Sequence, residues 1–242
     1  MRCASIGTPL HSSRDANRAS ERITTVRHRG RSLVVGSCSC TTSRAVVVRH
    51  GGLPPGFASR FAGGLGAVMV VDYASSDGGP YQELLFVPGR FRAPDGALYY
   101  AITRIFVSTQ VSVDSGIQNW GIPKERADFQ WSREDTLERV RVAQGDMPVA
   151  EFAFSSNSPG VLVTTDIVPS RFRTLAQLGA NGETVFTAPS GRGTVRLAKL
   201  ERVTVNPALF PDLSEFKPLV VTKAEPFQLG FPVPQKKRLA WT

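Results

Sequence analysis

A lysine follows an Ile-Pro dipeptide closely after a tryptophan, in the stretch Trp120–Lys124. Pro123 restricts the backbone before the lysine, while Ile122 and Trp120 supply apolar neighbours. Burial disfavours a charged ammonium, and a neutral amine can attack a carbonyl carbon to form a Schiff base. Lys124 is therefore a candidate nucleophile, although the same pattern also suits a lysine that begins a strand with its ammonium in water.

Other chemistries find less support in the sequence. It contains no GxGxxG or GxxxxGK[ST] loop for a nucleotide and no GxSxG nucleophile elbow. The three cysteines, Cys3, Cys38 and Cys40, have neither zinc spacing nor the number expected of a disulfide framework. The three histidines show no HxH or HExxH spacing. We therefore expect no metal site, and the low cysteine count fits a reducing intracellular compartment.

The formal net charge of +9 is concentrated at the N-terminus. Residues 1–31 hold seven arginines against two acidic residues, which leaves +4 for the rest of the chain. No basic stripe with interleaved aromatics follows, so we expect no nucleic-acid partner. The longest apolar runs, such as Ala67–Val71, are far shorter than the roughly 20 residues of a membrane-spanning helix, so we expect no membrane insertion.

Residues 1–23 are rich in Arg and Ser and lack the apolar stretch of a secretory signal. Two interpretations stay open for this segment, a disordered tail and an organellar transit peptide. In either case we exclude it from the fold and expect a single domain over residues 24–242. We expect a cytoplasmic protein, with organellar import as the alternative.

Short apolar or alternating runs separated by turn residues dominate the rest of the chain. They predict a mainly β (α+β) fold, a single antiparallel β-barrel or sandwich-like domain with a few short helices. We expect helices at Gly56–Ala62 and Pro169–Gly179, and a short helical turn at Pro207–Leu213. The expected strands are Ser32–Gly36, Ala45–Arg49, Ala67–Tyr73, Gln82–Val87, Leu98–Val107, Ala127–Trp131, Glu138–Val142, Val149–Phe154, Val161–Ile167 and Thr194–Val205.

Two short segments of the chain together resemble motifs of the acetoacetate decarboxylase family. Asn119–Ala127 is similar to the family's G-[YI]-P-K stretch, which carries its Schiff-base lysine. About 40 residues upstream, Gly79–Leu85 resembles the family's tyrosine-x-glutamate motif, whose glutamate lies in the active site. Between them, Leu98–Val107 looks like the strand that leads to the lysine loop. The resemblance covers roughly residues 30–235 and implies an acetoacetate decarboxylase-like fold.

The resemblance implies that Lys124 forms the Schiff base and that Glu83 handles protons. The protonated imine would itself accept the electrons released by the substrate, so no cofactor is expected. We expect a small-molecule oxo acid as the partner and a homo-oligomer as the assembly. Further candidates for substrate binding are Gln118, on the expected loop before the lysine, Tyr81, Trp120 and Arg126.

The sequence departs from the decarboxylase pattern at several positions. The decarboxylases have a second lysine where this chain has Glu125. Because neighbours on an extended backbone point to opposite faces, we expect Glu125 to point away from the reacting centre and Arg126 to share the side of Lys124. A second acidic residue of the family is not recognisable. The arginine for a substrate carboxylate could be Arg29 or Arg31.

Three functions stay open at this point. The first is a Schiff-base-forming lyase that acts on a small oxo acid, most simply by decarboxylating acetoacetate or a related 3-oxo acid. The second is an aldolase-dehydratase or hydratase that uses the same lysine on a 2-oxo acid. The third is a non-catalytic barrel that binds a small ligand.

Overall fold

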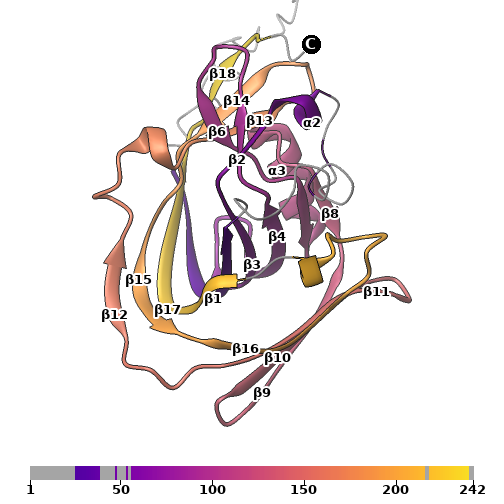
Figure 1. The fold of residues 1–242 in the computed structure, drawn as a ribbon, viewed down its shortest axis with the longest axis vertical. Coiled ribbons are helices and arrows are strands. Elements are labelled where there is room, and N and C mark those ends of the chain that lie inside the picture. The colour runs from indigo at the N-terminus through magenta and orange to yellow at the C-terminus, as the bar shows by residue number, and fades with distance from the viewer. Residues whose placement is uncertain (1–24, 39–46, 48–52, 54–55, 216–217, 240–242) are drawn as a thin grey trace, which may run out of the picture.

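The computed structural model describes residues 25–38, 47, 53, 56–215 and 218–239. The expected tail or transit segment at residues 1–23 lies outside this range. So does all of the expected strand Ala45–Arg49 except Val47. The described residues form a mainly β structure, as the sequence predicts, and its sheets pack as in a sandwich and do not close into a barrel (Figure 1). Among these residues, no helix is long and apolar enough to cross a membrane.

The described strands form three sheets. The eight-stranded sheet contains, in spatial order, β12 (Val161–Thr164), β15 (Ser190–Leu197), β17 (Pro218–Pro232), β1 (Thr25–Cys38), β3 (Leu65–Ser75), β4 (Tyr81–Val87), β7 (Arg104–Val107) and β8 (Lys124–Arg126). The four-stranded sheet contains β16 (Lys199–Val205), β11 (Met147–Ser155), β10 (Leu137–Gln144) and β9 (Asp128–Glu134). The six-stranded sheet contains β18 (Gln235–Lys237), β14 (Thr184–Thr187), β13 (Leu175–Leu178), β6 (Leu98–Tyr100), β5 (Arg90–Arg92) and β2 (Phe61–Gly63).

The two faces of β4 serve different parts of the molecule. Leu84 and Phe86 point to one face, where they join the core shared with the four-stranded sheet. Tyr81, Glu83 and Leu85 alternate with them and point to the opposite face. Since every other residue of a strand shares a face, the face that carries Glu83 is fixed by the burial of its apolar neighbours.

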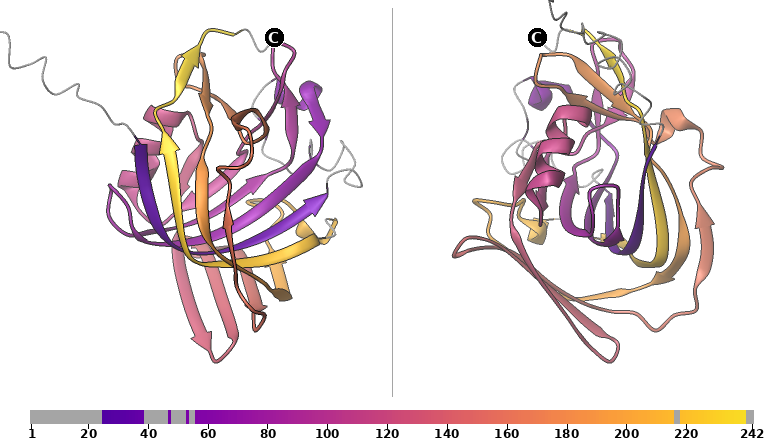
Figure 2. Two further views of the ribbon diagram at one scale, coloured as in Figure 1. Left: turned by 90° about the vertical axis from the view of Figure 1, so that its left-hand side faces the viewer. Right: turned by 180° about the vertical axis from the view of Figure 1, so that it is seen from behind.

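A helix covers the Glu83 face of the sheet. Helix α3 (Gln110–Trp120) connects β7 to β8, which are parallel neighbours, so the chain must cross over the sheet between them. The side chain of Thr109 accepts a hydrogen bond from the backbone N–H of Ser112 at the start of the helix. Gly121 ends it in the left-handed conformation, with φ 63°. The right-hand view of Figure 2, in which the molecule is seen from behind, shows α3 lying against the strands.

The remaining helices are short. They are α2 (Phe57–Arg60) and the 3₁₀ turns η1 (Ser170–Phe172) and η2 (Leu213–Glu215). The prediction of a helix at Pro169–Gly179 is wrong, because only η1 is helical and β13 follows it. Gln177 of β13 is buried and exchanges two hydrogen bonds with the backbone of Ile102, at 3.0 and 2.9 Å. These tertiary contacts hold the segment extended.

Two long predicted strands are each interrupted in the structure. Leu98–Val107 becomes β6 and β7, and Thr194–Val205 becomes the end of β15 followed by β16. In both cases the two parts belong to different sheets. A strand that changes sheets must break its ladder of hydrogen bonds, and an apolar run does not reveal such a break.

The packing of the large sheet against the four-stranded sheet predicts a large effect of truncation at Phe152. This side chain on β11 is completely buried in the shared core. Phe152→Ala should therefore lower the free energy of unfolding by about 3–5 kcal/mol, measured by urea denaturation. Phe172→Ala, at a position 52% exposed, is the matched control and should change it by less than about 0.5 kcal/mol. Equal effects of the two substitutions would contradict this description of the core.

Candidate active site

Lys124 and Glu83 form a buried ion pair. The Lys124 Nζ atom lies 3.1 Å from Glu83 Oε2, and the two side chains are only 9% and 6% exposed. Nζ also donates to the Ser112 hydroxyl at 3.0 Å and lies 5.2 Å from the centre of the Tyr81 ring. The two residues that the sequence singles out for chemistry are therefore in direct contact, although 41 residues separate them in the chain.

The sheet register explains this contact. Glu83 on β4 lies opposite Val107 of β7, and on the other side of β7 the residue Ile105 lies opposite Lys124. Two strand spacings, about 10 Å in all, separate β4 from β8. A lysine side chain is long enough to cross β7 and reach the carboxylate. The short strand β7 therefore sets the distance between the amine and the acid.

Helix α3 completes the surroundings of the amine. Ser112 lies in its first turn and accepts the hydrogen bond from Nζ through its hydroxyl. One turn later, Gly116 leaves room for the lysine stem, because a Cβ atom at this position would lie 2.5 Å from Lys124 Cδ. The helix thus supplies both a hydrogen-bond acceptor and a passage for the lysine.

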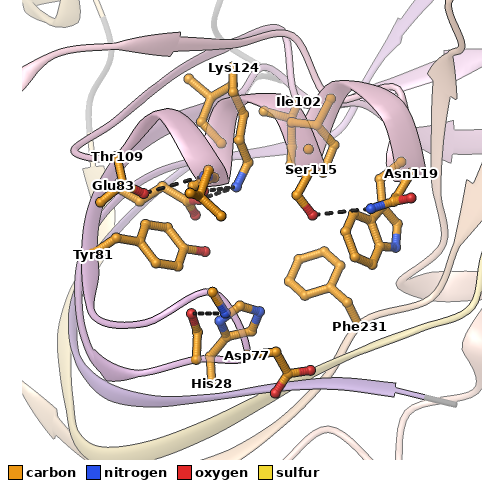
Figure 3. A pocket seen from close by; sticks show the side chains of 18 residues that line it. His28, Asp77, Tyr81, Glu83, Ile102, Thr109, Ser115, Asn119, Lys124 and Phe231 are labelled. Carbon is orange, nitrogen blue, oxygen red and sulfur yellow. Dashed lines mark hydrogen bonds and ion pairs between the residues drawn. The ribbon is translucent and has the colours of Figure 1, made fainter. Parts of the chain in front are cut away.

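The amine faces a cavity of about 320 Å³ (Figure 3). Its lining comes from β1, β4, α3, β8, the end of β17 and the segments beside them. In Figure 3, Tyr81 and Glu83 lie on one side of the cavity, Ser115, Asn119 and Phe231 on the other, and His28 opposite Lys124. The cavity therefore offers a polar, reactive end and a largely apolar remainder, the combination typical of small-molecule sites.

Two tyrosines extend the polar end. The Tyr73 hydroxyl donates to Glu83 Oε1 at 3.4 Å, and its ring stacks at a tilt against Tyr81, with centroids 4.6 Å apart. Burial, followed by the negative charge of Glu83, raises the pKa of both tyrosines well above the usual value. Both phenols therefore stay protonated at neutral pH, and that of Tyr73 donates to the acid of the ion pair.

His28 is buried in the wall opposite the lysine, with 7% of its surface exposed. Its ring lies 4.8 Å from that of Tyr73 and 6.0 Å from that of Phe231, centroid to centroid. Within the described residues, its buried Nδ1 atom has no hydrogen-bond partner. Burial is the largest influence on the pKa of His28 and lowers it. The carboxylates of Glu83 and Asp77 raise this pKa, and the positive charge of Lys124 lowers it further. The imidazole is therefore neutral at neutral pH.

The other residues proposed from the sequence separate into two groups. Tyr81 and Trp120 line the cavity together with Lys124 and Glu83. Gln118 and Arg126 do not line it. Gln118 lies on the exposed side of α3, since this segment is a helix and not the expected loop. Arg126, at the end of the three-residue strand β8, is exposed and pairs with Asp128.

Neither candidate arginine for a substrate carboxylate lines the cavity. Arg31 pairs with Asp72 at 3.0 Å and with Glu138 at 3.6 Å, and Arg29 is exposed. Glu125 points away from the amine, as strand alternation predicts, and pairs with Arg104 at 3.0 Å. Among the described residues, no group of three or more His, Cys, Asp or Glu side chains is placed to hold a metal ion.

Ser112, His28 and Tyr73 were not found by reading the sequence. A signal for Ser112 was present, because Thr109, Gly121 and Pro123 are typical start and stop residues of a helix between them. Tyr73 lies opposite Tyr81 in the β3–β4 hairpin, and the turn Ser76–Gly79 gives this register. His28 had no local signal, because only the pairing of β1 within the sheet brings it to the cavity.

A family model described as acetoacetate decarboxylase (ADC) matches residues 50–178, which is more than half of the chain and includes Glu83, α3 and Lys124. The chain belongs to the acetoacetate decarboxylase family. No curated protein matches its sequence significantly. The proposed relationship of the two sequence motifs to this family is thereby confirmed, whereas the roles of individual residues stay predictions.

Solved structures support the same fold for this acetoacetate decarboxylase family member. An acetoacetate decarboxylase from Legionella pneumophila has a TM-score of 0.69 at 14% identity, over 98% of this chain and 100% of that one. An acetoacetate decarboxylase-like enzyme from Sphingomonas wittichii RW1 gives 0.63 at 13% identity, over 90% and 94%. The enduracididine biosynthesis enzyme MppR complexed with pyruvate gives 0.57 at 17% identity, over 97% and 98%. At these identities the likeness shows the fold alone.

The burial of His28 predicts a specific loss of stability in acid. Its pKa in the folded protein lies below the unfolded value of 6.5, so the unfolded chain binds the proton more readily. The stability that the neutral imidazole contributes is complete above pH 6.5 and is lost as the pH falls through 6.5 toward the lower folded value. Lowering the pH from 7.5 to 5.5 should therefore destabilise the wild type more than His28→Gln, which has no proton to bind. Urea denaturation at both pH values measures this, and an equal loss in both proteins would contradict it.

Proposed function

We propose that this protein is a Schiff-base-forming lyase that uses Lys124 as nucleophile on a small oxo acid and decarboxylates a 3-oxo acid. The observation that carries the proposal is the buried Lys124–Glu83 pair at 3.1 Å, facing a cavity of about 320 Å³. Membership of the acetoacetate decarboxylase family supports it. The reaction and the substrate are inferences from the chemistry of this site.

The first step frees the amine. Glu83 accepts a proton from the Lys124 ammonium along their hydrogen bond. The Nζ lone pair then attacks the ketone carbon of the substrate, and the resulting carbinolamine takes up a proton and loses water. The product is an iminium ion that joins Nζ to the former carbonyl carbon.

The second step breaks a carbon–carbon bond. The bond between the carboxylate and its neighbouring carbon breaks, carbon dioxide leaves, and the bonding electron pair moves through the new double bond to neutralise the iminium nitrogen. Glu83 takes up a proton from solvent and delivers it to the enamine carbon, because the overall reaction consumes one proton. Water adds to the regenerated iminium, the ketone leaves, and Lys124 recovers its amine.

The lining of the cavity favours decarboxylation over aldol chemistry on a 2-oxo acid. Among the described lining residues, Lys124 is the single lysine or arginine, and Glu83 and Asp77 are acidic. A 2-oxo acid keeps its carboxylate through an aldol reaction, and this group would stay without a permanent cationic partner. A 3-oxo acid loses its carboxylate as neutral carbon dioxide, so an environment poor in cations promotes the reaction.

Lys124→Arg tests the nucleophile. Arginine keeps the positive charge and can still pair with Glu83, but a guanidinium stays protonated and cannot form the imine. Turnover of 3-oxo acids should fall at least a hundredfold, and borohydride should fix substrate carbon onto the wild type but not onto the variant, as measured by intact mass. Circular dichroism checks that the variant is folded. A variant that keeps a tenth or more of the turnover excludes the imine mechanism.

Two further results would redirect the proposal. If acetoacetate gave no carbon dioxide while pyruvate with an aldehyde gave a condensation product, the aldolase-dehydratase would replace the decarboxylase. If no small oxo acid could be trapped on the folded wild type, a non-catalytic ligand-binding domain would replace both enzymes.

Gly116→Ala tests the positioning of the amine. The added methyl group would lie 2.5 Å from Lys124 Cδ and 2.8 Å from Cε, so the flexible lysine must move away from Glu83 and Ser112. The rate of borohydride trapping should fall at least tenfold. The melting temperature should change little, because alanine is the better helix former. Asp114→Ala, on the exposed side of the same helix, is the control and should trap at the wild-type rate. An unchanged trapping rate in Gly116→Ala would show that imine formation does not depend on this position of the Lys124 side chain.

A further inference from the structure

The cavity is larger than acetoacetate requires. Its volume of about 320 Å³ is in the range of sites for drug-sized ligands, about 300–1,000 Å³. It would hold roughly ten water molecules at about 30 Å³ each. Acetoacetate, a four-carbon acid, would fill only the part next to the amine. A substrate that fills the cavity must carry a further group on the side away from Lys124.

The wall away from the amine is aromatic. The rings of Trp120 and Phe231 meet edge to face, with centroids 6.1 Å apart, and the ring of His28 meets Phe231 in the same way at 6.0 Å. The Trp120 indole N–H donates to the backbone carbonyl of Pro232 at 3.4 Å, which fixes the ring against β17. Rings held in this way present apolar faces and edges to a ligand and favour another aromatic group.

The polar groups near this wall are the Ser115–Asn119 pair, the neutral His28 and the acidic Asp77, and none of them is a cation. Asn119 donates to the Ser115 hydroxyl at 3.1 Å, and both lie beside Phe231 in Figure 3. Among the described lining residues, Lys124 is the single lysine or arginine, and it is already paired with Glu83. A negatively charged group at this end of the cavity would find no cationic partner among the described lining residues, whereas an apolar group would replace water on apolar walls.

We propose that Trp120, Phe231, His28, Ser115 and Asn119 form a subsite for an aromatic or similarly sized apolar substituent. The preferred substrate is then a 3-oxo acid that carries a phenyl-sized group beyond its ketone carbon, and not acetoacetate itself. The inference rests on the proposed function, because the Lys124 imine fixes the ketone carbon. It adds the part of the substrate that the amine does not touch.

A matched pair of substrates tests the subsite. The wild-type rate of carbon dioxide release is measured with acetoacetate and with 3-oxo-5-phenylpentanoate. We expect kcat/KM to be at least tenfold higher for the phenyl compound, since a well-packed apolar group typically contributes factors of this size or larger. Equal values, or a preference for acetoacetate, overturn the subsite. The imine mechanism would survive that result, because borohydride trapping is read separately.

Two variants on α3 locate the effect. Ser115→Leu fills the aromatic end of the cavity and should lower the ratio of the two kcat/KM values at least tenfold. Gln110→Leu places the same side chain on the exposed side of the helix and should keep the ratio. Asn119→Leu replaces Ser115→Leu if the latter does not fold. An unchanged ratio in the cavity-filling variant overturns the assignment of these residues.

A non-reacting ligand separates the subsite from the proposed function. 4-Phenyl-2-butanol cannot form an imine, so calorimetry measures only its contact with the cavity. We expect it to bind the wild type at least tenfold more tightly than Ser115→Leu. If this holds while borohydride traps neither oxo acid, the subsite stands and the proposed function fails. If the alcohol does not bind the wild type, the subsite is wrong.

Discussion

The contact between Lys124 Nζ and Glu83 Oε2 is the constraint on which the site depends. A buried ion pair is costly unless both partners are held and hydrogen-bonded. Here the acid is also bonded by Tyr73 and the amine also donates to Ser112. The strands β4, β7 and β8, the hairpin partner β3 and the helix α3 all contribute to this arrangement. The contact between the two side chains therefore depends on how β7 and α3 connect β4 to β8 at this edge of the sheet.

Glu125 stands where the resemblance to the decarboxylases would place a second lysine. Glu125 is turned to the far face and held by Arg104, so its negative charge does not act directly on Lys124. The amine instead donates to the Glu83 carboxylate and to the Ser112 hydroxyl in the first turn of α3.

Much of the fold and of the reactive pair could be predicted from the sequence, and the failures have physical causes. Alternation gave most strands correctly and placed Glu125 away from the amine, because a side-chain period of two is a local property. The segment around Gln118 was expected to be a loop, yet Thr109 and Gly121 cap a helix there. Tertiary packing decides the conformation of such a segment, since residues with poor helix propensity fold as a helix when one side is buried. His28 could not be predicted, because sheet pairing and not spacing brings it to the cavity.

The crossover between β7 and β8 also has a consequence for the nascent chain. In an unfolded polypeptide Lys124 is an ordinary, solvated lysine that carries a proton at neutral pH and has no nucleophilic lone pair. Its reactive setting needs Glu83, 41 residues earlier, and β7 and α3 in between. These contacts are distant in sequence, and such contacts form more slowly than local ones. Under the proposed mechanism, the surroundings that the amine needs therefore exist only once these elements have folded together.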